Sequence, residues 1–424
     1  MPDSIVTAYE ESDVLDPRTD AARPSVPPVI RPVDLGPVHV ATPVVLSPMA
    51  GVTNWPFRVI CESYGPDGLY VAEMITARAL VARNPKALRL CRFAPGEKIR
   101  SLQLYGVNPA IVEQAAKIVI DENMADHVDL NFGCPVPKVT RRGGGSALPW
   151  KTDLFREIIQ RVVKVCDAAN VPVTAKIRVG IDHEHETFLE AGHIAQEEGC
   201  KAVTLHARTT AEYYGGHSDW SRIGELVGAL DIPVFGNGDV WGANDALAMV
   251  SETGCAGVAI GRGCQGRPWL FADIKNAFAG SDERIDPTLG DVCTVIERHA
   301  QLLTEFYGGD ERMAVHDLRK HVAWYLKGFP VGGSTRRAFM ECENLEDVRR
   351  EIGKLDPDIR FPERVVDKPR GRVRFAKICL TDGWNPAKQR MPSGRRCSGT
   401  IRWMRATERR IPSGPWNEWE TSMR

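Results

Sequence analysis

The stretch HVDLNFGCP, residues 127–135, has the form of a buried strand that ends at a glycine and continues into a loop. Eight runs of this form follow one another along the chain. They lie at Val44–Gly51, Leu69–Ile75, Arg100–Gly106, His127–Gly133, Pro172–Gly180, Ala202–Arg208, Pro233–Asp239 and Gly257–Arg262, with helix-like segments such as Asn108–Glu122, Thr152–Ala169, Glu184–Glu198 and Trp241–Thr253 between them. Strand and helix that alternate eight times over about 220 residues indicate an α/β fold, the (β/α)8 TIM barrel.

A doubly wound open sheet is the main alternative to the barrel. Such a sheet more often carries a Gly-rich dinucleotide turn after its first strand. No such turn follows Val44–Gly51. We therefore predict a barrel over residues 41–285.

Polar residues stand at the carboxyl end of every predicted strand, where barrels of this kind place their chemistry. They are Ser47 to Gly51, Glu73, Gln103, Asn131 with Cys134, Lys176 with Arg178, His206 with Arg208, Asn237 to Asp239, and Gly261 with Arg262. A single polar residue in such a place is more often a helix cap or a turn residue than a ligand contact. Eight of them around one mouth predict a site.

Two features of this mouth favour a phosphate-bearing cofactor or substrate. The segments 236–239 and 261–263 are rich in glycine and end strands seven and eight, where barrels commonly bind phosphate through backbone N–H groups. Lys176 and Arg178 alternate on one strand and so point the same way. The alternative for Lys176 is burial as a compensating charge against Glu73 or Asp129.

Cys134 is the candidate reactive group. Three cations (Lys138, Arg141 and Arg142) and three glycines at 143–145 follow it, which makes the segment mobile and attractive to anions. Most free cysteines are packing residues. A cysteine in the core needs no such surroundings, so we predict a functional thiol.

Six motifs together resemble the tRNA-dihydrouridine synthases, nearest the bacterial B-type branch. They are LSPMAGVTN at 46–54, QLYG at 103–106, NFGCP at 131–135, AKIRVG at 175–180, LHART at 205–209 and NGD at 237–239. The likeness runs from about Pro43 to about Glu363, with Phe132 where Met is frequent and Gly144 where Ala is usual. It implies an FMN-binding oxidoreductase of CH–CH bonds. With NADPH as reductant, it would reduce the C5–C6 double bond of chosen uridines in tRNA to 5,6-dihydrouridine.

The resemblance also implies roles for single residues. Pro48, Met49 and Ala50 would lie along the flavin ring and Gln103 and Lys176 at its polar edge, while His206, Asn237, Gly238, Asp239, Gly261 and Arg262 would hold the ribityl chain and phosphate. Hydride from flavin N5 to uracil C6 leaves a carbanion at C5, and Cys134 is the implied acid that protonates it. We therefore expect a protonated thiol, whose pKa the neighbouring cations do not strongly depress.

A change of pattern after the barrel predicts a helical tRNA-binding domain at residues 286–363. Its segment Leu318–Phe339 holds five Lys or Arg, no acid and four aromatic residues, the mixture of cations and stacking rings that RNA-binding surfaces use. The alternative places Trp324 and Tyr325 in the core. The tRNA contacts that we expect are Asn131, Arg141, Arg142 and Arg178 in the barrel, and Arg319, Lys320, Lys327 and Arg336 in the helical domain. The target base must be extruded from the tRNA to reach the flavin.

The net charge of −1 at pH 7 conceals an uneven distribution. Residues 364–424 hold 15 Lys and Arg against 5 Asp and Glu, which leaves a net charge of −11 on residues 1–363. We expect a basic, disordered tail at 364–424 and a disordered lead at 1–40. The tail departs from the family pattern, so a frameshifted or misannotated end is an alternative.

The cysteine pattern and the amino-terminal composition give further expectations. The eleven cysteines show no C-x-x-C spacing and no companion histidine cluster, which predicts no metal and no disulfide framework. No apolar stretch before Leu35 is long enough for a signal peptide or a membrane span. We expect a cytoplasmic monomer without a membrane partner.

Two rival functions remain open. A class I aldolase would also be a barrel with a phosphate site, and Lys176 would form a Schiff base. It leaves Cys134, Gln103 and the basic helical segment unexplained. A tRNA-binding chaperone without chemistry is the second rival, and its activity would survive a Cys134→Ala change.

Overall fold

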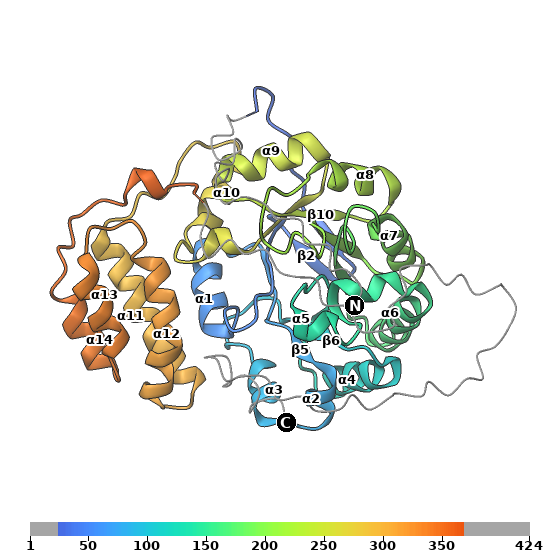
Figure 1. Ribbon diagram of the computed structural model, residues 1–424, viewed down its shortest axis with the longest axis horizontal. Helices are drawn as coiled ribbons and strands as arrows, with labels where there is room; N and C mark the ends of the chain where they lie inside the picture. The colour runs from blue at the N-terminus through green and yellow to red at the C-terminus, as the bar shows by residue number, and fades with distance from the viewer. Residues whose placement is uncertain (1–23, 369–424) are drawn as a thin grey trace, which may run out of the picture.

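The computed structural model describes residues 24–368, and their central element is a closed ring of parallel strands (Figure 1). In chain order the strands are β3 (Val44–Leu46), β4 (Leu69–Tyr70), β5 (Ile75–Thr76), β6 (Ser101–Tyr105), β7 (His127–Phe132), β8 (Val173–Arg178), β9 (Ala202–His206), β10 (Val234–Asn237) and β11 (Gly257–Ile260). Their order in the sheet is β4-β3-β11-β10-β9-β8-β7-β6-β5. The predicted barrel is confirmed.

The second strand of the barrel is split into two pieces. β4 pairs with β3, whereas β5 pairs with β6. Between them, Val71 forms a parallel bridge to Ser101 of β6, and this bridge closes the ring. The nine strand segments therefore make an eight-stranded barrel.

Helices cover the outer face of the barrel, as Figure 1 shows. They are α1 (Trp55–Tyr64), α2 (Ala77–Val81), α3 (Pro85–Leu90), α4 (Pro109–Asp121), α6 (Thr152–Asp167), α7 (Phe188–Glu197), α8 (Ser221–Ala229), α9 (Ala243–Thr253) and α10 (Leu270–Phe278). Asn54 and Asn108 begin α1 and α4 by accepting a hydrogen bond from the third backbone amide of each helix. α7 begins four residues later than we expected, because the Asp182 carboxylate accepts bonds from the amides of Glu184 and His185 and holds a turn there.

The long connection after β7 folds back towards the barrel mouth. It contains α5 (Pro137–Thr140) and the 3-10 helix η2 (Gly145–Trp150). A second 3-10 helix, η3 (Arg262–Cys264), follows β11.

A hairpin closes the amino-terminal end of the barrel, within the lead that we expected to be disordered. Its strands are β1 (Val33–Leu35) and β2 (Val38–Val40), paired antiparallel. Their residues alternate between buried and exposed, and Leu35 and Val40 are fully buried in a cluster with Phe235. This apolar alternation around a Gly-Pro turn contradicts the expectation for residues 33–40. Residues 1–23 lie outside the described range.

Four helices form a separate unit beside α1 (Figure 1). They are α11 (Leu289–Phe306), α12 (Glu311–Tyr325), α13 (Gly332–Glu341) and α14 (Leu345–Ile352), and the short helix η4 (Glu363–Val365) follows them. Their hydrophobic core also includes Trp55, Ile60 and Trp269 from the barrel. The expected helical region is confirmed. The disorder expected from residue 364 onward is wrong for residues 364 and 365, which belong to η4, and Arg364 donates to the carbonyl oxygen of Gly328 at 2.7 Å. Residues 369–424 of the basic tail lie outside the described range. No helix in residues 24–368 has the length and apolar character needed to cross a membrane.

Candidate active site

A cavity of about 910 Å³ opens at the carboxyl ends of the strands. Its lining includes, from the barrel, Pro48, Met49, Ala50, Asn131, Cys134, Lys176, Arg178, His206, Arg208, Tyr214, Asn237, Gly238, Asp239, Trp241, Gly261 and Arg262, and, from α12 and its end, Lys320, Trp324 and Lys327. Most of the predicted site residues therefore meet around one space, whose volume suits a ligand of nucleotide size.

Arg208 and Asp239 form a buried ion pair in the wall of the cavity. The Nη2 atom of Arg208 lies 2.6 Å from Oδ2 of Asp239, and both side chains are almost fully buried. Nε and Nη2 of Arg208 also donate to the carbonyl oxygens of Gly215 and Gly216, and Nη1 lies 3.4 Å from Nε2 of His206. Asp239 therefore holds Arg208 in place, and its carboxylate is already satisfied by protein groups.

Arg262 is less well satisfied by the protein. Its nearest polar partners are Oδ1 of Asp239 and the carbonyl oxygen of Tyr214, both at 3.5 Å. The guanidinium lies 5.2 Å from the ring centre of Tyr214 and 4.9 Å from that of Trp241. Burial, with repulsion from Arg208, lowers the pKa of Arg262 to about 10. A cation in this state gains from a bound anion, which supports the predicted phosphate position.

Two further atoms at this cavity favour a polar ligand. Ser47 Oγ and Trp241 Nε1 are buried and have no hydrogen-bond partner among residues 24–368, although both residues line the cavity. Buried polar groups in proteins are nearly always satisfied by protein, water or ligand. A ligand with both hydrogen-bonding groups and a phosphate therefore fits this lining.

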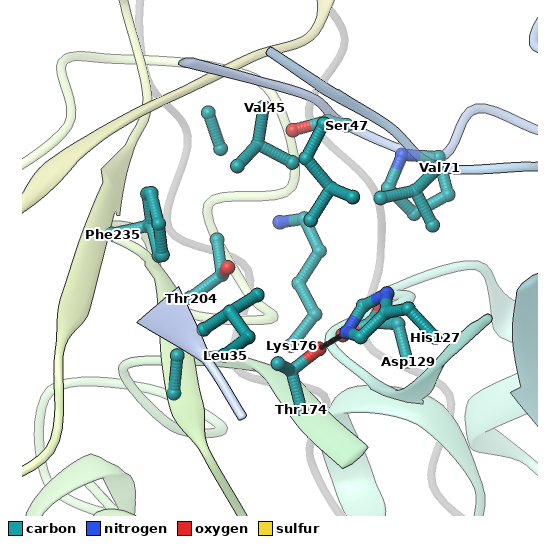
Figure 2. Close-up of a pocket in the computed structure, with 14 residues that line it drawn as sticks. Leu35, Val45, Ser47, Val71, His127, Asp129, Thr174, Lys176, Thr204 and Phe235 are labelled. Carbon is teal, nitrogen blue, oxygen red and sulfur yellow. Dashed lines mark hydrogen bonds between the residues drawn. The ribbon is translucent and has the colours of Figure 1, made fainter. Parts of the chain in front are cut away.

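Lys176 projects from β8 between the large cavity and a small one of about 10 Å³ beneath it. Figure 2 shows its side chain extending away from Asp129 and Thr174 towards Ser47. The amine donates to Oδ1 of Asn237 at 2.8 Å. Burial, followed by repulsion from Arg178, lowers the pKa of Lys176 to about 7, while Asp129 acts in the opposite direction. Lys176 therefore forms no ion pair with Asp129, which was the alternative, because its amine donates to the side-chain oxygen of Asn237 instead.

The loop that carries Cys134 is held from both sides, in contrast to the mobile segment that we expected. Oδ1 of Asn131 accepts from the amide of Cys134 at 3.1 Å. The carbonyl oxygen of Cys134 accepts from Ser146 N at 3.0 Å and Ser146 Oγ at 3.1 Å. Nε of Arg178 donates to the carbonyl oxygen of Gly133 at 2.9 Å. The thiol is thus fixed at the cavity wall.

The surroundings of Cys134 favour the protonated thiol. The residue is half-buried, whereas the other eight cysteines in residues 24–368 are buried. Burial raises the pKa of Cys134, and a hydrogen bond with the backbone of Val136 and the charge of Arg178 oppose this effect without reversing it. A protonated thiol at neutral pH is able to act as a general acid.

Several predicted residues lie apart from the cavity lining. Gln103 is fully buried between Asn131 and Asp129. Arg141 and Arg142 are exposed at the end of α5. Arg319 and Arg336 donate to backbone carbonyls within the helical unit, at Cys342 for the first and at Leu326 and Phe329 for the second. Arg178, although at the cavity, is bound to Gly133 and Thr209.

Two groups of residues were not predicted as site residues. Tyr214 and Trp241 flank Arg262, and they lie in loops without a strand-end signal. Asp317 of α12 pairs with Lys320, and its Oδ2 accepts from Asn54 at 3.1 Å. This contact joins α12 to the start of α1 and orients Lys320 at the cavity rim. Tyr325 is buried, as the core alternative for the aromatic residues expected, whereas Trp324 lines the cavity.

Gly145 is the glycine on which the position of Cys134 depends most directly. Its φ is +57°, and a Cβ atom there would overlap the carbonyl oxygen of Cys134. We expect Gly145→Ala to displace the loop and increase the rate of Cys134 alkylation by iodoacetamide severalfold, measured by peptide mapping. Gly143→Ala is the matched control, because φ is +72° there and open space surrounds the position. Equal alkylation rates in both variants would contradict the prediction.

Comparisons with known proteins give one family. The family model described as dihydrouridine synthase matches residues 45–357. A relative from Mycobacterium tuberculosis, named probable tRNA-dihydrouridine synthase, is 47% identical over 392 residues, which cover 90% of this chain and 99% of the relative. A protein of the same name from Mycobacterium leprae is 48% identical over 367 residues, covering 80% and 95%. tRNA-dihydrouridine synthase B of Pseudomonas putida is 36% identical over 315 residues, covering 74% and 91%.

Proposed function

Since the chain belongs to the dihydrouridine synthase family, we propose that its cavity binds FMN and one extruded uridine of tRNA, with Cys134 as the acid. The reaction is the reduction of the C5–C6 double bond of uridine in tRNA to 5,6-dihydrouridine. The half-buried thiol of Cys134 at the wall of the large cavity is the observation that carries this proposal, and burial, which raises its pKa, favours the protonated form. Family membership favours this reductase over the aldolase and the chaperone.

The cavity lining fits FMN in two parts. The excess of positive charge around Arg262 suits the phosphate, with backbone N–H groups near Gly238 and Gly261 beside it. Pro48, Met49 and Ala50 offer a surface for the ring, and Lys176 a positive charge for its polar edge. When bound, FMN supplies the hydride that reaches C6 of the uracil. The orphaned Ser47 Oγ and Trp241 Nε1 supply further hydrogen bonds to the ligand.

Cys134 delivers the proton that completes the reduction. Its Sγ would donate to C5 of the uracil and leave a thiolate, which solvent reprotonates. Arg178 lies close enough to oppose the rise in the thiol pKa, so it stabilises the thiolate that forms during the step. Asn131 and Ser146 hold the backbone of Cys134 on both sides and thereby fix the direction of this transfer. His206 is uncharged, since burial and nearby cations lower its pKa well below the usual value.

We assign the reductant and the cellular setting on chemical grounds. NADPH would reach the flavin through the open mouth of the cavity, which the extruded base occupies later in the cycle. A reducing, cytoplasmic location is supported by nine free cysteines in residues 24–368. We propose a monomer as the working unit, with the cations at the mouth as its tRNA contacts.

The cavity rim beside α12 is the tRNA contact that the structure supports best. Lys320, Trp324 and Lys327 line the cavity from the helical unit, and they combine two cations with a stacking ring. Arg141 and Arg142 are exposed at the end of α5 and extend the positive charge on the barrel side. We propose that these five residues hold the tRNA while the base enters the cavity.

We expect Lys327→Ala to weaken tRNA binding about fivefold at 0.1 M salt and to reduce the slope of log K against log salt by about one. The loss of one phosphate contact is the physical reason. Binding is measured by fluorescence anisotropy with unmodified tRNA. Lys164→Ala, at an exposed position of α6 away from the cavity, is the control and should bind as the unchanged protein does. An equal loss of tRNA affinity in both variants would mean that the effect comes from the net charge of the protein and not from a contact at Lys327.

A spectrum followed by two half-reactions tests the function itself. The purified protein, loaded with FMN, should show flavin absorption bands that NADPH bleaches in the absence of oxygen. Unmodified tRNA should restore the bands, and tRNA that already carries dihydrouridine should not. A protein that binds no FMN, or whose reduced flavin is indifferent to unmodified tRNA, would overturn the proposal.

A further inference from the structure

A continuous chain of six polar side chains, five of them buried and the last, Asn131, partly exposed, runs through the barrel interior to Cys134. Its members are, in order, Ser101, His127, Thr174, Asp129, Gln103 and Asn131, from strands β6, β7 and β8. Figure 2 shows the part that surrounds the base of Lys176, with the contact from Asp129 to Thr174. None of the first five belongs to the lining of the large cavity, so the reaction described above leaves them without a role.

The backbone donors of Gly133 and Cys134 identify the amide orientations on one side of this chain. Oδ1 of Asn131 accepts from the amides of Gly133 at 3.3 Å and Cys134 at 3.1 Å, so its Nδ2 faces the other way. That Nδ2 donates to Oε1 of Gln103 at 2.8 Å. Nε2 of Gln103 must then donate, and it does so to Oδ2 of Asp129 at 2.7 Å.

The other side of the chain also ends at Asp129. Oγ1 of Thr174 donates to Oδ1 of Asp129 at 2.6 Å, so it accepts from Nε2 of His127 at 3.0 Å. Nδ1 of His127 then accepts from the hydroxyl of Ser101 at 2.7 Å. Burial lowers the pKa of His127 to about 4, so the ring carries one proton at neutral pH, as this assignment requires.

We propose that Asp129 is a positioning residue for Cys134, because it is the common acceptor that fixes the amide of Gln103 and, through Gln103, the amide of Asn131. The inference rests on the proposed role of Cys134 as the acid. Without an acceptor at position 129, the Gln103 amide has no preferred orientation, and Asn131 loses the partner that directs its oxygen to the backbone of Cys134. Buried networks of this kind are stable only when every donor has an acceptor.

The direction of the chain allows a reversal test. Asn131→Asp places the Gln103 amide between two carboxylates. The amide nitrogen donates to one of them, so the amide oxygen faces the other, and no hydrogen lies between these two oxygen atoms. Adding Asp129→Asn reverses the chain: Gln103 donates to the new carboxylate at position 131, and the new amide at position 129 donates to Gln103 while accepting from Thr174. Asp129→Asn alone keeps an acceptor for Gln103, because the new amide oxygen accepts from Gln103. The new amide nitrogen then donates to Thr174, and the hydrogen bonds from Thr174 through His127 to Ser101 reverse their direction.

The readout is hydrogen exchange of the Cys134 amide in the protein without tRNA or reductant, followed by mass spectrometry or NMR. We expect Asn131→Asp to accelerate this exchange about tenfold, the double variant to restore it, and Asp129→Asn alone to change it less than about threefold. The single-turnover rate of uridine reduction should follow the same order, while NADPH still reduces the bound flavin. If the Asn131→Asp variant does not fold and the double variant does, that result would also support the proposal. No recovery in the double variant would overturn it.

Repulsion between the two carboxylates is the competing explanation for recovery. The two explanations are distinguished by making the same changes at positions 129 and 131 in a Gln103→Met background. This substitution removes the amide but keeps the length of the side chain. The coupling between positions 129 and 131 should then disappear. Coupling that persists without the Gln103 amide contradicts the proposal. Amide exchange is measured in the absence of the reaction, so it does not depend on the role of Cys134 as the acid. A Cys134→Ala variant that remains active would contradict that role but would leave the exchange results unchanged.

Discussion

Cys134→Ala is expected to slow the single-turnover reduction of uridine by about 10²- to 10⁴-fold, the usual contribution of a positioned general acid. The thiol is the half-buried cysteine of the described residues and it lines the cavity, so its proton lies next to the proposed substrate. FMN binding and flavin reduction by NADPH should stay within about twofold, because neither step uses the thiol proton. Stopped-flow absorbance measures both half-reactions separately.

Two control variants sharpen this result. Cys134→Ser keeps the size of the side chain but offers a much weaker acid, so its rate should stay close to that of Cys134→Ala. Cys293→Ala changes a buried cysteine of α11, away from the cavity, and should leave the oxidation by tRNA unchanged. A Cys134→Ala variant with an unchanged rate of oxidation by tRNA would remove Cys134 from the mechanism and favour a solvent-derived proton.

Lys176→Met is expected to have the second-largest effect, a loss of about 10²-fold in flavin reduction by NADPH. The amine is the cation that the fold places at the base of the cavity, fixed by Asn237 at 2.8 Å. Removing it withdraws the positive charge that would stabilise the reduced ring. Stopped-flow bleaching of the visible flavin absorption measures the step. An unchanged rate of bleaching would contradict the role of Lys176 at the ring.

The same substitution should stabilise the protein in the absence of FMN. Burial lowers the pKa of Lys176 to about 7 from its usual value, so the unfolded chain binds the proton more tightly than the folded one. The cost of the buried charge is complete below about pH 7 and disappears as pH rises towards the ordinary pKa of lysine. We therefore expect Lys176→Met to add at least about 1 kcal/mol to the unfolding free energy at about pH 6 and little at about pH 10. Lys164→Met, at an exposed position, is the control and should change the unfolding free energy at about pH 6 by less than about 0.5 kcal/mol.

The barrel was predictable from sequence because strand and helix repeat with a regular period, and the carboxyl ends of the strands share one end of the barrel by topology. This places Lys176, Asn237 and Arg262 together without further information. The direction of each side chain depends instead on its neighbours in space. Gln103 was expected at the flavin, yet Asp129 and Asn131 take up its amide inside the barrel.

Other differences arise from contacts between distant segments. Arg178 has the charge of a phosphate ligand, but the carbonyl oxygens of Gly133 and Thr209 occupy it, and a linear pattern contains no sign of either. Tyr214 and Trp241 meet Arg262 from two separate loops. The hairpin of β1 and β2 was predictable in principle, since its alternation is local, but its short strands stand within a proline-rich segment.

The amide of Asn54 belongs to the barrel and to the helical unit at once. Its oxygen accepts from Phe57 at the first turn of α1, and its nitrogen donates to Asp317 of α12. Beside it, Phe57 stacks against His299 and His321, and Trp55 contacts Phe306. Neither unit is able to lose its structure without exposing apolar surface of the other. We therefore expect the barrel and the helical unit to unfold together, in a single calorimetric transition.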